Sequence, residues 1–392
     1  MIPSPFFFGG ALAPDRLIDR QEQLRDIVTN LQDGGRLFLI GPRRFGKTSL
    51  LLAARREAGA RGLKTVMVNA EGHLTLDGLA ERLVVEAGNV LGESLREKAG
   101  NLVKWLAALK PSVSYDPMTD SLSASITAAE RGPQATNIAE ALDLLDRIAG
   151  ERRIRLGVIV DEFQEVTRRE GFGAEKVLRA RVQEHQNLSY VFSGSDTSLM
   201  SAMVMKHNRP FYRLGSTLWL GYLPDEEVAA FVREGFGTVG VSVSDEAIAR
   251  IFELSARVPY NIQRLSAQLF TAVRQEGRDG HRVEVADVDE ALERIFDSVR
   301  QTYFLYLRSQ TASRQRVLVA LANETQRALP VAKLAARLGL PVSTVRSARA
   351  SFLDGDVLRL PADVIRDGAI EFVDPFFERW LARAENGRLD IS

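Results

Sequence analysis

The sequence predicts a three-layer α/β core that is followed by two smaller, mainly helical parts. The short apolar stretch 36–40 predicts a strand that leads through a glycine-bounded loop into a helix. The β-branched run 156–160 ends on two acids, as expected for a central strand of a parallel sheet. After Pro224 the strand pattern disappears and helical patterns follow. We therefore expect an α/β core at 1–222, a helical lid subdomain at 223–308 and a winged-helix domain at 309–392.

The loop after the first strand matches the phosphate-binding pattern G-x-x-x-x-G-K-[ST] without a mismatch. Its glycines let backbone N–H groups curl around an anion, and the positive end of the next helix faces that anion too. Lys47 supplies a charge for the β- and γ-phosphates, and Thr48 supplies a hard oxygen ligand for Mg²⁺. The expected nucleotide-binding residues of this P-loop are Gly41, Pro42, Arg43, Arg44, Phe45, Gly46, Lys47, Thr48 and Ser49.

Two adjacent acids, Asp161 and Glu162, end the apolar run that begins at Leu156. Ligands of parallel sheets lie beyond the carboxyl ends of the strands, so both acids should emerge beside the P-loop. This is the Walker B arrangement, in which Asp161 holds Mg²⁺ and Glu162 orients or deprotonates the attacking water. A surface turn is the usual alternative for two such acids, but the complete P-loop upstream favours the catalytic interpretation.

Polar residues after a further strand, 188–193, are candidates for sensing the γ-phosphate. Ser195 is preferred over Asp196, and capping of the next helix is the alternative for either residue. Arg209 and Arg213 are candidate transition-state cations, acting in cis or from a neighbouring subunit. The alternative is an exposed or ion-paired arginine with no catalytic role, which is the commoner case.

Three further stretches carry expectations of their own. Residues 112–128 alternate apolar and polar side chains around a central turn, which predicts a β-hairpin insertion, either a surface ornament or a functional element. The apolar segment 1–14 is expected to pack as a loop on the nucleotide domain, with Arg20 near the adenine. Pro259, in a turn before a lid helix, is a candidate nucleotide contact, although proline is also common at helix starts.

The pattern from Ala312 onward is three helices followed by two short strands, which is the winged-helix order. No acid falls between Glu324 and Asp354, a local excess of cations that suits phosphate contacts in a major groove. Many such domains instead bind protein or only pack internally, and acids lie close by in the wing. The expected DNA contacts are Lys333, Arg337, Ser343, Thr344, Arg346 and Arg349.

Composition limits the remaining possibilities for the 392 residues. Lysine and arginine number 51, as do aspartate and glutamate, so any nucleic-acid surface must be local rather than a global basic field. Cysteine is absent, which excludes disulfides and thiolate chemistry and agrees with a reducing, cytoplasmic location. The four histidines are scattered, so we expect no zinc site. No apolar run approaches the length of a membrane span, and no basic residue precedes the apolar N-terminus as in a signal peptide.

Taken together, these stretches resemble the archaeal-type P-loop ATPase family, a bacterial and archaeal branch near the STAND and AAA+ classes. The double arginine within the P-loop and the Asp-Glu-Phe-Gln string at 161–164 are the most specific features. The matching stretches are 8–9, 18–22, 41–50, 160–165, 192–195, 210–213 and 372–380. The resemblance implies an ASCE-type core with an additional strand between the two Walker strands, a helical lid, a winged helix, ATP and Mg²⁺. Relatives often carry Gly-x-Pro before the lid helix, where this chain has Arg257–Val258–Pro259.

The main hypothesis from the sequence is an ATP-hydrolysing molecular switch in which nucleotide state changes how the lid and the winged helix are held. Hydrolysis should be slow unless a partner or a second subunit completes the site, because positioning and charge stabilisation dominate phosphoryl transfer. One alternative is a nucleotide-gated regulator that binds double-stranded DNA and hydrolyses little. The other is a signalling scaffold whose winged helix docks a partner protein.

Overall fold

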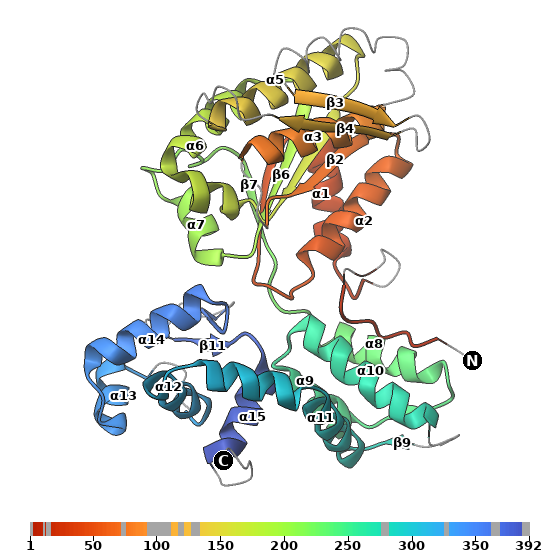
Figure 1. The fold of residues 1–392 in the computed structure, drawn as a ribbon. Coiled ribbons are helices and arrows are strands. Elements are labelled where there is room, and N and C mark those ends of the chain that lie inside the picture. The colour runs from red at the N-terminus through yellow and green to blue at the C-terminus, as the bar shows by residue number, and fades with distance from the viewer. Residues whose placement is uncertain are drawn as a thin grey trace. The chain divides into compact units, whose positions relative to one another are not determined.

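The computed structural model describes residues 3–10, 12, 17–71, 76–91, 111–116, 121–126, 134–275, 282–324, 329–361 and 369–385. Contacts divide the chain into two compact units, one of residues 11–220 and one of residues 1–10 and 221–392 (Figure 1). Among the helices of these described residues, none is long and apolar enough to cross a membrane.

The unit at 11–220 is built on a five-stranded parallel sheet in the order β2-β5-β6-β1-β7. The strands are β1 (Arg36–Ile40), β2 (Lys64–Asn69), β5 (Leu156–Asp161), β6 (Leu188–Gly194) and β7 (Ser216–Trp219). β6 pairs with both β1 and β5, so a strand separates the P-loop strand from the strand that ends on the acids. This is the ASCE-type order that the resemblance implied.

Helices cover both faces of this sheet, which gives the predicted three layers (Figure 1). They are α1 (Gln21–Asp33), α2 (Lys47–Ala60), α3 (Leu76–Leu91), α5 (Gln134–Glu151), α6 (Gln164–Glu184) and α7 (Thr197–Met205). Phe38 and Ile40 of β1 point into a core shared with α3, α5, α6 and α7. The alternate residues Leu37 and Leu39 point to the opposite face, where α1 packs on α2. Buried side chains on both faces explain why the central strands are continuously apolar.

The predicted insertion is an antiparallel pair, β3 (Pro111–Asp116) with β4 (Ser121–Ile126). The hairpin expected at 112–128 is therefore confirmed in its two strands. Residues 95–109, whose sequence pattern predicts a helix, lie outside the described residues.

The second unit is mainly helical. Its elements are α8 (Asp225–Gly237), β8 (Ser242–Val243), α9 (Asp245–Ser255), α10 (Pro259–Gln275), β9 (Arg282–Val283), α11 (Val285–Ser309), α12 (Ala312–Ala322), α13 (Val331–Leu338), α14 (Val342–Asp354), β10 (Leu358–Arg359), β11 (Glu371–Phe372) and α15 (Pro375–Glu385). β10 and β11 are antiparallel, with Leu358 opposite Phe372. The observed order from α12 to β11 is three helices and then two paired strands.

The C-terminal helix ties the two predicted parts of this unit together. Arg383 of α15 forms a bidentate ion pair with Glu293 of α11, with distances of 2.5 and 2.8 Å. Arg379 of α15 donates to the backbone oxygen of Glu253 in α9 at 2.8 Å. Residues 221–392 therefore cluster as one unit, and a boundary at 308/309, which coincides with the end of α11, stays a prediction.

Residues 3–10 of the N-terminal segment belong to the helical unit and not, as we expected for 1–14, to the nucleotide domain, whereas Leu12 belongs to the α/β unit. Phe6 is 3% exposed and contacts the rings of Phe231, Phe236 and Phe270, with centroid distances of 5.2–5.8 Å. A glycine at 235 makes the space, because a Cβ there would lie 2.4 Å from the Phe6 ring. The phenylalanine cluster of α8 and α10 thus supplies the apolar surface that buries Phe6.

Candidate functional site

The candidate site lies at the carboxyl edge of the parallel sheet, where three neighbouring strands end. The P-loop follows β1, Asp161 is the last residue of β5, and Ser195 follows β6. Because all three strands run parallel, their ends meet at one edge. The topology of the sheet therefore brings together three motifs that are spread over residues 41–195 of the sequence.

The P-loop backbone adopts the tight curve that an anion-binding loop requires. Gly46 has φ +90° and Arg44 has φ +70°, both in the left-handed region. Gly41 lies so close to the end of β7 that a Cβ there would be 2.8 Å from Leu220. Gly46 caps α2 without any side-chain hydrogen bond to the helix, so the first N–H groups of α2 face the loop interior.

Lys47 lies inside this loop. Its Nζ donates to the backbone oxygen of Pro42 at 3.0 Å, and the residue is 5% exposed. Burial lowers the pKa of Lys47, while the nearby Glu162 and Asp161 carboxylates act in the opposite direction. The ammonium group of Lys47 would therefore be stabilised by a bound anion in addition to these two carboxylates.

Thr48, near the start of α2, and Asp161, at the end of β5, form a hydrogen bond with each other. Thr48 Oγ1 donates to Asp161 Oδ2 at 2.7 Å, and Asp161 is fully buried. The other carboxylate oxygen, Oδ1, accepts from the backbone N–H of Glu162 at 3.0 Å. A hydroxyl and a carboxylate this close are the hard oxygen ligands that Mg²⁺ takes, so the predicted metal ligands fit one ion.

Glu162 is fixed by a small hydrogen-bond network. Its Oε2 accepts from Gln164 Nε2 at 2.7 Å, from Ser195 Oγ at 2.6 Å and from the Ser195 backbone N–H at 3.2 Å. No hydrogen bond from the described residues reaches its Oε1. Glu162 itself has φ +52°, a left-handed conformation that is uncommon for this residue type and occurs at functional sites.

The charge state of Glu162 follows from these contacts. Burial alone would raise the pKa of its carboxyl group. The Lys47 charge and the hydrogen bonds from Gln164 and Ser195 outweigh burial and leave the pKa below its usual value. Glu162 is therefore ionised at neutral pH and can accept a hydrogen bond or a proton.

The remaining P-loop positions have different surroundings. Arg43 Nη2 pairs with Glu71 Oε1 at 2.6 Å, and both side chains are partly exposed. Arg44 is exposed and Phe45 is 1% exposed. Ser49 Oγ accepts the backbone N–H of Leu12 at 2.9 Å, so this hydroxyl holds the incoming chain. A direct contact of Ser49 with nucleotide stays a prediction.

Ser195 and Asp196, the two residues after β6, have different roles in the structure. Ser195 bonds to Glu162, as described above. Asp196 is the N-cap of α7, where its carboxylate accepts from Leu199 N–H at 2.9 Å and from Arg168 Nη2 at 2.7 Å. The helix-capping alternative thus describes Asp196, and Ser195 is the residue at the site.

The candidate transition-state arginines lie away from this edge. Arg213 precedes β7, which runs parallel to β1, so it sits at the amino edge of the sheet, opposite the P-loop. It is exposed, has φ +53° and lies over the Tyr212 ring at 5.1 Å. Arg209 bonds to Glu175, which is fully buried and also accepts from Thr167. Arg209 is therefore a structural ion-pair partner, and Arg213 cannot act on the nucleotide of its own unit.

Arg20 and Pro259 were the two other candidate nucleotide contacts. Arg20 is the N-cap residue of α1, which packs on α2, and it is 8% exposed; burial lowers its pKa. Pro259 begins α10 in the second unit. Earlier in the same turn, Ala256 and Arg257 have φ of +50° and +56°. Arg257 thus adopts, at the position where relatives often carry glycine, a conformation that glycine adopts more easily.

Arg349, one of the predicted DNA contacts, is buried and therefore does not reach a DNA phosphate. Arg349 is 9% exposed and its Nη1 donates to the Leu329 backbone oxygen at 3.2 Å. It lies four residues after the buried Val345 and three before the buried Phe352, on the same stripe of α14. That spacing was present in the sequence and argues against a phosphate contact by Arg349. On α13 and α14, Lys333, Arg337, Ser343 and Arg346 are exposed, and Thr344 is half-buried; Arg337 pairs with Glu324 at 3.0 Å.

Two residues of this edge were not singled out from the sequence. Gln164 holds Glu162, and its own Oε1 is buried without a partner among the described residues. Glu71 follows β2 and pairs with Arg43 of the P-loop. Both lie within three residues of the end of a strand at this edge, β5 for Gln164 and β2 for Glu71, so the same rule that identified Asp161 could have identified them.

No protein-family model matches this sequence, and no curated protein matches it. Solved structures do. The Walker-type ATPase PABY2304 of Pyrococcus abyssi is 17% identical, with TM-score 0.62, over 96% of this chain and 99% of that chain. The ORC2 protein of Aeropyrum pernix, in ADPNP and ADP complexes, is 14% identical with TM-score 0.56, over 97% and 98%. The ORC1 protein of Aeropyrum pernix in complex with DNA is 16% identical with TM-score 0.50, over 94% and 93%. The chain therefore has the fold of the archaeal P-loop ATPases that it was predicted to resemble.

Proposed function

We propose that this protein is an ATP-binding molecular switch that hydrolyses ATP slowly with Mg²⁺. The observation that carries the proposal is the meeting of Thr48, Asp161 and Glu162 beside the P-loop, with Thr48 Oγ1 only 2.7 Å from Asp161. Thr48 is in α2, which follows β1, and Asp161 ends β5. Since β6 separates these two strands, a local folding preference does not explain why the two residues meet.

Each side chain has a role that follows from its position. Lys47 and the N–H groups of the P-loop would hold the β- and γ-phosphates, since a buried ammonium gains most from a close anion. Thr48 and Asp161 would hold Mg²⁺, which when bound neutralises charge that develops on the phosphate oxygens. Glu162 would orient the attacking water through Oε1, while Gln164 and Ser195 fix Oε2.

Slow turnover follows from where the arginines lie. Arg209 is bonded to a buried glutamate, and Arg213 is at the opposite edge of the sheet. Neither can stabilise the transition state within its own unit, a contribution that is worth about 10³–10⁵ in rate in P-loop enzymes. We infer that a neighbouring copy or another partner supplies this charge. A homo-oligomer and a cytoplasmic location both stay predictions.

The direct test compares three proteins for ATP binding and for steady-state phosphate release. Glu162→Gln should keep ATP affinity and lose phosphate release, because it removes the water-orienting charge and not a phosphate ligand. Lys47→Ala should lose both. The proposal fails if the wild type neither binds nor hydrolyses ATP with Mg²⁺, or if Glu162→Gln turns over as fast as the wild type.

The exposed cations of α13 and α14 favour DNA binding as a second function, coupled to nucleotide state. Lys333 and Arg346 are exposed and form no ion pair with the described acids. Their loss in a Lys333→Gln, Arg346→Gln variant should weaken duplex binding and reduce its salt dependence by about two charges. Arg300→Gln, on the exposed face of α11, is the matched control for charge. Unchanged binding in the double variant would favour the docking of a partner protein.

A further inference from the structure

A cavity of about 1040 Å³ lies in the α/β unit at the amino edge of the sheet, opposite the candidate nucleotide site. It is bounded by the carboxyl ends of α2, α3 and α5 and by the starts of β2 and β5. Its volume is at the upper end of the range that small-molecule sites occupy. Nothing in the proposed ATPase reaction uses this edge of the sheet.

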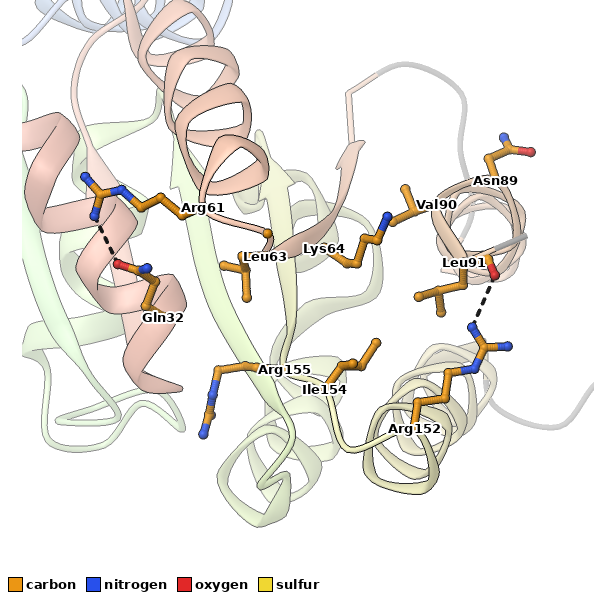
Figure 2. Close-up of a pocket in the computed structure, with 11 residues that line it drawn as sticks. Gln32, Arg61, Leu63, Lys64, Asn89, Val90, Leu91, Arg152, Ile154 and Arg155 are labelled. Atoms are coloured by element: carbon orange, nitrogen blue, oxygen red, sulfur yellow. Dashed lines mark hydrogen bonds between the residues drawn. The ribbon is translucent and has the colours of Figure 1, made fainter. Parts of the chain in front are cut away.

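The floor of the cavity is apolar. Leu63, Val90, Leu91 and Ile154 line it, and their side chains lie between the charged ones (Figure 2). They come from three segments, the turn before β2, the end of α3 and the turn before β5, so the cavity does not depend on one loop. An apolar surface in a concave site favours a ligand with an apolar or aromatic body.

The rim of the cavity is basic. Arg61, Lys64, Arg152 and Arg155 line the cavity, and no acid lines it among the described residues. In Figure 2 Arg61 is directed toward Gln32, and the Arg155 guanidinium points away from the apolar residues. Arg61 is already neutralised, since it pairs with Glu57 and donates to Gln32. The other three bond only to carbonyl oxygens or to nothing described. Arg152 donates to the Leu91 oxygen at 3.1 Å, and Arg155 to the Gln186 oxygen at 3.4 Å.

Lys64 and Arg152 are like charges without a described carboxylate partner, and an anion bound beside them would be attracted to both. We propose that this cavity binds a small amphipathic anion, with its apolar body on Leu63, Leu91 and Ile154 and its acidic groups toward Lys64 and Arg152. The same cations also lie near helix carboxyl ends, where positive charge stabilises the helix dipole. If these cations only stabilise the helix ends, replacing one of them would lower the stability of the protein and leave anion binding unchanged.

The probe for the test is 8-anilinonaphthalene-1-sulfonate, which has an aromatic body and one sulfonate. Methyl NMR of the wild-type protein reports binding at Leu63, Leu91 and Ile154 directly. These methyl signals should shift saturably with the sulfonate and about tenfold more weakly with the neutral analogue N-phenyl-1-naphthylamine, because one charged hydrogen bond is lost. This comparison needs no variant, so it does not depend on how a mutant folds.

Two variants then locate the charge. Arg152→Gln should weaken sulfonate binding about tenfold, and Arg25→Gln, on an exposed part of α1 outside the cavity, should not change it. The proposal is overturned if the cavity methyls do not respond. It is also overturned if the sulfonate and its neutral analogue bind equally well, or if Arg152→Gln lowers only the unfolding midpoint. ATP turnover is not part of the readout, so this result and the test of the ATPase are independent.

Discussion

Removing the Ser195 hydroxyl separates two roles that a polar residue after β6 can have, contact with nucleotide and positioning of Glu162. The structure assigns the second, since Ser195 Oγ lies 2.6 Å from Glu162 Oε2. A hydrogen bond to a charged group contributes about 1.5–3 kcal/mol. Gln164 and the Ser195 backbone N–H remain on the same oxygen in Ser195→Ala, so we expect the lower end of that range.

In kinetic terms this is a loss of about tenfold in the rate of phosphate release, with ATP affinity unchanged. Loss of the same hydrogen bond raises the pKa of Glu162, because that bond favours the charged form. Because that pKa lies below its ordinary value of 4.5 in the wild type, Glu162 stays ionised at pH 7 in the variant. The loss therefore comes from the position of the carboxylate and not from its protonation.

The assay is a double-mutant cycle of Ser195→Ala and Glu162→Gln, with phosphate release and ATP binding measured for each protein. If Ser195 acts through Glu162, its substitution has little further effect in the Glu162→Gln background. Asp196→Ala is the matched control, because Asp196 caps α7 and does not touch Glu162; it should cost about 1 kcal/mol of stability and leave turnover unchanged. Additive effects in the cycle, or weaker ATP binding in Ser195→Ala, would refute the positioning role.

Three other outcomes follow from buried charges. Arg209→Ala leaves Glu175 unpaired in the core, so urea unfolding should show a loss of about 3–5 kcal/mol with ATP affinity retained; a loss below about 1 kcal/mol would contradict the buried pair. Arg349→Ala should lower the free energy of unfolding by about 1–3 kcal/mol, because the Leu329 oxygen loses its donor, while exposed Arg346→Ala should change it by less than about 0.5 kcal/mol; equal losses would refute this assignment. The folded pKa of Glu162 is depressed, so its carboxylate stabilises the fold above the unfolded pKa and this contribution is lost as pH falls through the folded pKa. The unfolding free energies of the wild type and Glu162→Gln should therefore converge below about pH 4.5, and a pH-independent difference would contradict the assigned shift.

The parts of the site that the sequence predicted are those that depend on a general rule of parallel sheets. Lys47, Asp161 and Ser195 each follow an apolar strand, and strands that run parallel must end at one edge. The pattern of glycines and the paired acids identified two of these ends without any knowledge of the strand order. The order itself, with β6 between β1 and β5, followed only from the family resemblance.

The parts that could not be predicted depend on which surfaces meet in three dimensions. Phe6 lies more than 220 residues from Phe231 and Phe270 in sequence, so no local pattern indicates that they pack together. Arg213 matched a motif, but only the direction of β7 relative to β1 shows that it is at the wrong edge to act in cis. Arg349 is different, because its spacing from Val345 and Phe352 was visible in the sequence and indicated a buried position. The prediction of a DNA contact rested on its charge and not on this spacing.

The central claim is that Thr48 and Asp161 hold one magnesium ion beside a triphosphate that Lys47 grips. Calorimetric titration of ATP with and without Mg²⁺, into the wild type and into Asp161→Asn, tests it most directly. The account predicts that Mg²⁺ strengthens ATP binding in the wild type and that this dependence is lost in Asp161→Asn. ATP binding that is equally strong in EDTA, or a magnesium dependence that survives in the variant, would contradict it.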